Sequence, residues 1–264
     1  VSGSEVWFLA RGEHLRAMRE GGLRVNASDE RFVVPPGRMT DGPQEVGVCD
    51  VVLFCVKSYD TGPAARMISP LVGDATVIIS LQNGIDNEET IGSLLQRGTV
   101  YGGVAYVYAT ITGPGEISET GGPKKLVFGP LEAGAADPRS TRILSEMQAA
   151  GISATLSNDI RTDLWKKFIF IGAVGPVTAL TRLTLGEILA VDETRSLLEE
   201  AMREGAAVAR AAGIVIDSSL VPGMFETLRR FDNRSRSSMY NDLARGKPLE
   251  IEAFSGTIVR LGRE

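Results

Sequence analysis

The sequence predicts an α/β domain over residues 1–158, followed by an all-α domain over residues 159–264. In the first half, short apolar runs rich in Val, Ile and Phe alternate with segments of helical spacing, which is typical of a doubly wound sheet. From about Asn158 the apolar residues recur at helical intervals instead. Each half is long enough to bury a core of its own, so we expect two domains.

The expected elements of the first half begin with a strand over residues 6–10 and a helix that ends at the glycines 21–22. Two short strands, 23–27 and 31–35, then form a hairpin. Continuous runs of β-branched and aromatic residues suit strands that are covered on both faces; they lie at 49–58, 75–84 and 101–111. A strand over 125–130, a helix near 137–149 and a strand over 152–157 complete this half.

The second half is expected to hold helical segments throughout. The first, "RTDLWKKFIFIGAVGPVTALT", covers residues 161–181, and a long amphipathic stretch from Asp192 to Ala212 ends at Gly213. Three shorter segments follow, at 220–232, 237–246 and 249–262. The cleft between two such domains is the usual place for a ligand.

The composition argues against several classes of binding partner. The net charge of −5, the pI near 5.2 and the scattered arginines argue against nucleic acid. One histidine and two cysteines, Cys49 and Cys55, give no metal-ligand spacing, so we expect no metal and a reducing cytoplasmic setting. No apolar stretch is expected to approach the ~18 residues that cross a bilayer, so we expect no membrane partner.

Polar residues follow three of the expected strands. Arg11 follows the first strand, Lys57 the second and Asn83 the third. Ligands of open α/β sheets bind beyond such strand ends. An arginine stands where an acidic residue would hold the ribose of NAD, and a guanidinium suits a 2′-phosphate, which favours NADP(H). The alternative is that each residue only opens a surface turn.

A lysine lies on the apolar face of the first helix of the second half. Leu164, Phe168 and Ile171 form a buried stripe at helical spacing, and Lys167 shares that face, whereas Lys166 lies about 100° away. Lys167 therefore either extends its ammonium to the surface or holds it in a polar cleft where its proton is used.

Two further polar features lie near the end of the chain. Ser237-Ser238 precede an apolar residue and predict a helix N-cap. Glu250 and Glu252 are expected to open a helix after Pro248, where carboxylates favour the positive end of the helix dipole. Periodicity leaves open which glutamate faces the cleft.

Taken together, these stretches resemble the ketopantoate reductase family. The resemblance runs in order through "LARGEHLRAMREGGLRV", "VVLFCVKSYDT", "SLQNGIDNEE", "LWKKFIFIGAVGPVTAL" and "SSMYNDLARGKPLEIEAFSG". It implies an NADP-binding Rossmann-type domain followed by a helical substrate domain. It also implies an NADPH-dependent oxidoreductase of pantothenate and coenzyme A biosynthesis, which reduces a 2-oxo acid, with 2-dehydropantoate as the expected substrate.

The resemblance implies a role for each candidate residue. Lys167 matches the catalytic lysine, which binds the ketone oxygen and delivers a proton, and Glu250 matches the carboxylate that positions substrate and lysine. Ser238 matches the serine that binds the substrate carboxylate region, and Asn83 the asparagine near nicotinamide and substrate. Arg11 and Lys57 match the residues that hold the 2′-phosphate, and together with Asn83 they are the expected cofactor-binding residues.

The sequence also departs from the family pattern. Family members carry substrate-binding asparagines at the positions of Ile171, Gly175 and Leu185, and often one at Ser235. A reductase of a more apolar 2-oxo acid and a non-catalytic NADP(H)-binding sensor therefore stay open as alternatives. The resemblance further implies that the first strand with its glycine loop, and about 40 residues at the other end, lie outside this sequence. A homodimer is also left open.

Overall fold

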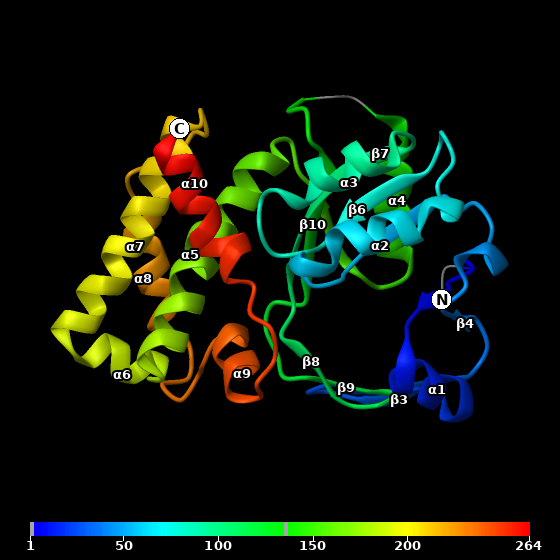
Figure 1. The fold of residues 1–264 in the computed structure, drawn as a ribbon, viewed down its shortest axis with the longest axis horizontal. Helices are drawn as coiled ribbons and strands as arrows, with labels where there is room; N and C mark the ends of the chain where they lie inside the picture. Colours follow the sequence, from blue (N-terminus) through cyan, green and yellow to red (C-terminus); the bar gives the residue numbers. More distant parts are fainter. Residues whose placement is uncertain (1–2, 135–136) are drawn as a thin grey trace. The chain divides into compact units, whose positions relative to one another are not determined.

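The computed structural model describes residues 3–134 and 137–264 (Figure 1). The chain divides into two compact units, which we describe one after the other. The first comprises Val1–Cys55, Thr61–Leu81 and Glu88–Ile160, and the second comprises Val56–Asp60, Gln82–Asn87 and Arg161–Glu264. The domain boundary that the sequence places after residue 158 stays a prediction.

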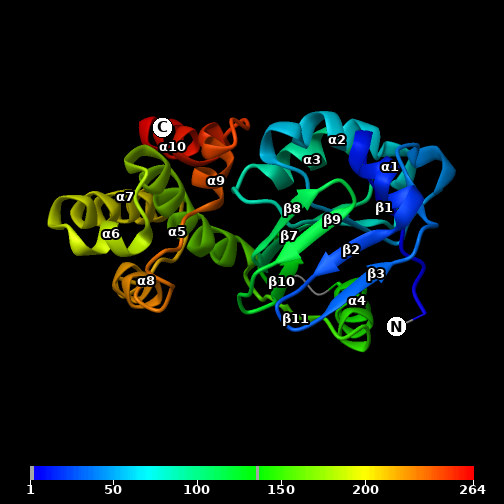
Figure 2. The same cartoon turned by 90° about the horizontal axis from the view of Figure 1, so that it is seen from below.

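A five-stranded sheet forms the centre of the first unit, in the order β11-β10-β7-β6-β5. Its strands are β5 (Val51–Phe54), β6 (Val77–Ser80), β7 (Thr99–Tyr106), β10 (Lys125–Pro130) and β11 (Ser153–Leu156). All neighbours are parallel except β7 and β10. Helices α2 (Thr61–Met67) and α3 (Asn87–Leu95) cover one face, and α4 (Pro138–Ala149) covers the other (Figures 1 and 2). Every residue of β6 is buried, as its apolar run predicts.

A second sheet, in the order β3-β2-β9-β8, lies in the same unit (Figure 2). The expected hairpin is confirmed as β2 (Leu23–Asn26) and β3 (Arg31–Val34). The single strand expected at 101–111 is wrong, because the chain leaves the first sheet at Tyr106 and enters the second as β8 (Ala109–Gly113). Its partner β9 (Glu116–Glu119) was missed, because the turn glycines between the two strands obscure their short alternating pattern.

The strand expected at 6–10 is reduced to β1 (Phe8–Leu9). Among the described residues it pairs with β4 (Met39–Thr40) alone, in parallel. Helix α1 (Gly12–Gly21) follows it and buries Leu15 and Met18 against Leu23. The helix ends at Gly22, whose φ of +79° and whose closeness to the Val34 carbonyl oxygen, 2.4 Å from an added Cβ, require a glycine.

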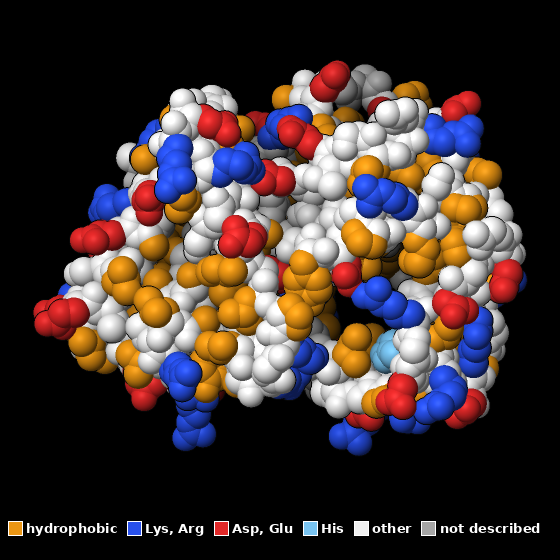
Figure 3. Space-filling model, in the orientation of Figure 1, with side chains coloured by type: hydrophobic (Ala, Val, Ile, Leu, Met, Phe, Trp, Pro, Cys, Tyr) orange, Lys and Arg blue, Asp and Glu red, His pale blue; other side chains and the backbone are white. Residues whose placement is uncertain are grey.

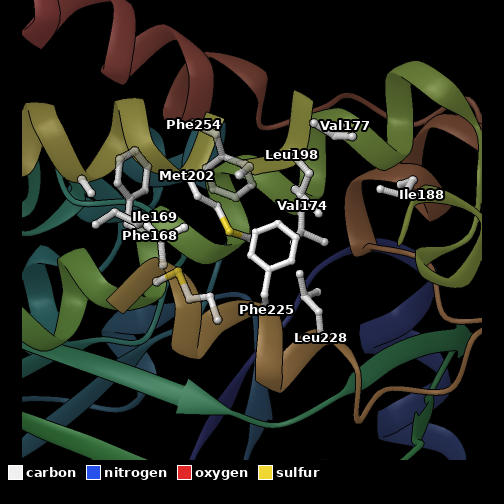
Figure 4. Close-up of a cluster of buried hydrophobic side chains, with 14 of the residues drawn as sticks. Phe168, Ile169, Val174, Val177, Ile188, Leu198, Met202, Phe225, Leu228 and Phe254 are labelled. Atoms are coloured by element: carbon white, nitrogen blue, oxygen red, sulfur yellow. The ribbon is translucent and has the colours of Figure 1, made fainter. Parts of the chain in front are cut away.

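Helices make up most of the second unit. They are α5 (Ile160–Thr181), α6 (Leu185–Ala190), α7 (Asp192–Ala211), α8 (Leu220–Leu228), α9 (Ser238–Ala244) and α10 (Thr257–Arg263), with a π-helical turn at Glu252–Gly256 before α10. Side chains from α5, α7, α8 and the π-helical turn point toward one another in its apolar core, among them Phe168, Met202, Phe225 and Phe254 (Figure 4).

Helix α5 corrects one expectation from the sequence. Its 22 residues are long and apolar enough, by length and composition, to cross a bilayer. However, 56% of its most apolar window is buried inside the protein, and its residues Phe168, Ile169 and Val174 belong to the core. The high hydropathy therefore follows from packing on several sides rather than from contact with lipid.

Charged side chains are dispersed over the surface. On the face drawn in Figure 3, Lys and Arg side chains are interspersed with Asp and Glu side chains. Most ion pairs of the described residues are exposed, such as Arg203 with Glu199 on α7. Such pairs contribute little to stability, so the buried ion pairs of the second unit stand out.

Candidate active site

Two segments of the first half of the chain fold with the helical unit. Val56–Asp60 follows β5 and Gln82–Asn87 follows β6; we call them the strand-end segments. Asp86 fastens the second of them to α10, because its Oδ2 accepts a hydrogen bond from Thr257 Oγ1 at 3.1 Å and pairs with Arg260. The sequence-predicted residues Lys57 and Asn83 thereby lie in the same unit as Lys167, Ser238 and Glu250.

Lys57 forms ion pairs with two carboxylates. Its Nζ lies 2.8 Å from Glu250 Oε2 and 2.9 Å from Asp242 Oδ2. Burial opposes the charge on Lys57, but the hydrogen bonds and charges of Glu250 and Asp242 outweigh it and raise the pKa of the ammonium. These contacts were not predicted. The contact of Lys57 with a 2′-phosphate stays a prediction.

Glu250 is a buried carboxylate with a donor on each oxygen. Its side chain is 6% exposed, and besides the Lys57 ammonium on Oε2 it accepts the backbone N–H of Ser58 on Oε1, at 3.0 Å. It immediately precedes the helix that begins at Ile251. Of the two glutamates that the sequence left open, Glu250 is the one buried in this cluster, and Glu252 is exposed.

Lys167 lies on the buried face of α5, as the spacing predicts. Its neighbours Leu164 and Phe168 are buried, whereas Lys166 is exposed. Burial lowers the pKa of Lys167 from its usual 10.5 to about 8, and the charge of Glu250 offsets only part of this effect. A lysine that extended freely into water would not be perturbed in this way. Lys167 is therefore a half-buried ammonium that loses its proton near pH 8.

Asn83 and Ser238 supply uncharged polar groups. The backbone oxygen of Asn83 accepts a hydrogen bond from Asn87 Nδ2 at 3.0 Å, which shapes the turn around Gly84. Ser237 is the N-cap of α9, as predicted, since its Oγ accepts the Tyr240 N–H at 3.0 Å. Ser238 is exposed, and its hydroxyl forms no hydrogen bond to any residue that the structure describes.

Arg11 belongs to the first unit. It is the exposed N-cap residue of α1, two residues after the end of β1. A helix N-terminus offers free backbone N–H groups to an anion, and a guanidinium adds two parallel donors. The donor set at this strand end therefore fits a phosphate of a dinucleotide. The cofactor contacts predicted for Arg11 and Asn83 stay predictions.

The positions that depart from the family pattern are packed. Leu185 is 4% exposed and belongs to the apolar core. A Cβ at Gly175 would lie 3.6 Å from the Phe254 ring and 3.7 Å from Met239. Ile171 packs against the same core, and the backbone carbonyl of Ser235 accepts the N–H of Leu185 at 2.9 Å. At Ile171, Gly175 and Leu185 an aliphatic side chain or no side chain fits the packing of the helical core.

Comparison with known proteins identifies the family. A family model described as "Ketopantoate reductase PanE/ApbA" matches residues 2–133, and its C-terminal counterpart matches residues 159–264. The chain belongs to the ketopantoate reductase family. The resemblance and the fold class inferred from the sequence, a Rossmann-type domain followed by a helical domain, are confirmed.

Several ketopantoate reductases are similar over nearly the whole chain. A 2-dehydropantoate 2-reductase from Halobacterium salinarum is 30% identical over 96% of this chain and 82% of its own length. One from Mesorhizobium japonicum is 29% identical, over 98% and 84%. The crystal structure of a PanE/ApbA family ketopantoate reductase from Ralstonia eutropha superposes with a TM-score of 0.90 at 32% identity, covering 99% of this chain and 85% of that one.

Asp242 is the site residue that the sequence analysis missed. It lies four residues after Ser238, on the same face of α9. That spacing was available in the sequence. The lysine that it pairs with is 185 residues away along the chain, so no local pattern could have revealed the contact.

Proposed function

We propose that this chain reduces 2-dehydropantoate to pantoate with NADPH, in the biosynthesis of pantothenate and coenzyme A. The observation that carries the proposal is the half-buried Lys167, whose charge is supported by the fixed Glu250 carboxylate. The relatives from Halobacterium salinarum and Mesorhizobium japonicum are named for this reaction. Neither alternative, a more apolar substrate or a non-catalytic sensor, is favoured.

NADPH, when bound, supplies the hydride that reduces the ketone carbon. We assign the proton to Lys167. Its ammonium donates a hydrogen bond to the ketone oxygen, stabilises the negative charge that develops there and then delivers a proton to it. With a pKa of about 8, this lysine is mostly protonated at pH 7 and gives up its proton more readily than an exposed lysine.

Glu250 has two tasks in this proposal. Its negative charge favours the ammonium form of Lys167, which burial disfavours. Its carboxylate also positions the substrate relative to the lysine. The two donors on Glu250, from Lys57 and Ser58, keep its orientation fixed, so that little reorganisation is needed during the reaction.

The remaining residues bind substrate and cofactor. We assign the Ser238 hydroxyl to the carboxylate region of the 2-oxo acid, and the Asn83 amide to the substrate and the nicotinamide. Arg11 is assigned to the 2′-phosphate of NADPH, because a guanidinium fits a phosphate with two parallel hydrogen bonds. This assignment predicts a preference for NADPH over NADH.

We also propose that the protein is a cytoplasmic homodimer. Its two cysteines are free, which agrees with a reducing compartment. A ketopantoate reductase from Staphylococcus aureus, similar at 22% identity, is described as dimeric. The molar mass in solution, measured by light scattering after gel filtration, tests this part: a mass near 28 kDa contradicts it.

A substrate screen tests the proposed function. The purified protein is incubated with NADPH and either 2-dehydropantoate or a set of aliphatic and aromatic 2-oxo acids, and NADPH absorbance is followed. We expect the highest kcat/KM with 2-dehydropantoate. Binding of NADPH without oxidation by any 2-oxo acid would instead identify a sensor, and faster oxidation with an apolar 2-oxo acid would identify a different substrate.

A further inference from the structure

Asp242 is a carboxylate that the proposed function leaves without a task. Its side chain is 16% exposed, and its Oδ2 contacts the Lys57 ammonium at 2.9 Å. Its backbone oxygen separately accepts the N–H groups of Arg245 and Lys247, at the end of α9. These backbone contacts do not need the carboxylate, so the side chain can be changed without removing them.

The Lys57 ammonium stands between two carboxylates at nearly equal distances. It lies 2.8 Å from Glu250 and 2.9 Å from Asp242. Because Ser58 donates its backbone N–H to the other oxygen of Glu250, the pair Lys57-Ser58 contacts both oxygens of that carboxylate. A movement of the Lys57 side chain therefore changes the contact on Glu250 Oε2, which is one of the two that orient this carboxylate.

Two lysines and two carboxylates interact in this cluster. Lys57 and Lys167 are two cations, and Asp242 and Glu250 are two anions. Tyr59 and Asp60 are titratable groups on the same strand-end segment, and the charges of Lys57, Asp242, Glu250 and Asp60 act on the Tyr59 phenol. Removal of the Asp242 charge lets Lys57 turn fully toward Glu250.

We propose that Asp242 is a positioning residue for the reductase reaction: it holds the Lys57 ammonium and thereby fixes the Glu250 carboxylate that supports Lys167. This role rests on the proposed function, and it adds to that function a residue that acts through Lys57 and Glu250. Asp242 is assigned no contact with substrate or cofactor. Its removal should therefore change kcat and its pH dependence.

The first experiment replaces the charge and keeps the shape. In Asp242→Asn, the Lys57 ammonium moves toward Glu250 and offsets more of its negative charge. Glu250 then stabilises the ammonium form of Lys167 less. We expect kcat at pH 8 to fall about tenfold, and the alkaline limb of the pH profile to move down by about half a pH unit. Asp242→Glu restores the charge and should keep the alkaline limb of the unmodified protein, which a purely packing role would not predict.

Asp192→Asn is the matched control. Asp192 is an exposed carboxylate in the same unit, paired with Arg195 on α7 at 2.6 Å. The control removes one aspartate charge and one ion pair but leaves the Lys57 cluster intact, so kcat and the pH profile should not change. If Asp242→Asn behaves like this control, the proposal is wrong.

A double-mutant cycle tests whether Asp242 acts through Lys57. The double variant Lys57→Gln/Asp242→Asn should lose no more kcat than Lys57→Gln alone, because the intermediary is already gone. Multiplicative losses would show that Asp242 acts independently and would overturn the proposal.

A readout without substrate separates this proposal from the proposed function. The pH dependence of Lys167 acylation by acetic anhydride, followed by peptide mass spectrometry, reports its titration directly. We expect the midpoint to fall in Asp242→Asn and to stay unchanged in Asp192→Asn. An unshifted midpoint in Asp242→Asn overturns the positioning role. If no 2-oxo acid is reduced but the midpoint falls, the proposed function fails and the link from Asp242 to Lys167 stands.

Discussion

Lys167→Met should strongly reduce turnover and yet stabilise the protein. Lowering the pKa of a lysine from 10.5 to about 8 corresponds to about 3 kcal/mol against its charged form in the folded state. Methionine fills a similar volume without a charge. The variant should therefore gain up to about 3 kcal/mol in free energy of unfolding at pH 7, while kcat falls by roughly 100-fold or more for loss of the proton donor.

The gain in stability of Lys167→Met should decrease as the pH rises. The folded pKa of Lys167 lies below the unfolded value, so between pH 8 and 10.5 the unfolded chain binds more protons than the folded one. The penalty for the charged lysine is fully present below pH 8 and disappears as the pH rises to 10.5. The advantage of Lys167→Met should therefore shrink from about 3 kcal/mol at pH 7 to near zero at pH 10.5.

Urea unfolding followed by circular dichroism, at pH 7 and pH 10, measures this difference between the variant and the unmodified protein. Lys166→Met is the control, because Lys166 is the exposed neighbour on the same helix. It should change the free energy of unfolding by less than about 0.5 kcal/mol and leave kcat intact. A Lys167→Met protein that is no more stable at pH 7, or whose gain does not change with pH, would refute the reasoning.

Three further outcomes are expected. The kcat/KM for NADPH-dependent reduction should fall above an alkaline limb near pH 8, to about a tenth at pH 9, as Lys167 loses its proton; a flat profile to pH 10 excludes it as the acid. Arg11→Ala should raise the Kd for NADPH, by fluorescence titration, at least tenfold more than that for NADH, and equal losses contradict its contact with the 2′-phosphate. Gly84→Ala should cost about 1–3 kcal/mol of stability, because φ is +113° and an added Cβ lies 3.0 Å from Asn87 Nδ2; an unchanged urea midpoint argues against that strain.

Patterns with a strong period were predictable from the sequence. The buried run of β6, the hairpin of β2 and β3, and the N-cap at Ser237 all follow local rules of spacing and capping. The face of α5 that carries Lys167 follows from helix geometry alone. These features depend on residues close together in the chain, which is why the sequence reveals them.

Contacts between distant residues were not predictable in the same way. The pairing of Lys57 with Asp242 and Glu250 joins positions 185 and 193 residues apart. The strand β9 was missed because turn glycines precede a short, only half-buried run. The family resemblance supplied the roles of Lys167 and Glu250, but it did not supply the ion pairs that hold Glu250.

The two strand-end segments mean that the boundary along the gene and the boundary in space do not coincide. A recombinant that joined residues 1–158 of one family member to residues 159–264 of another would take Lys57 from one parent and both of its carboxylates from the other. Residues 57, 242 and 250 must therefore come from the same parent, although residue 57 lies before the junction at position 158 and the other two lie after it. A viable exchange of the helical unit must carry Val56–Asp60 and Gln82–Asn87 with it.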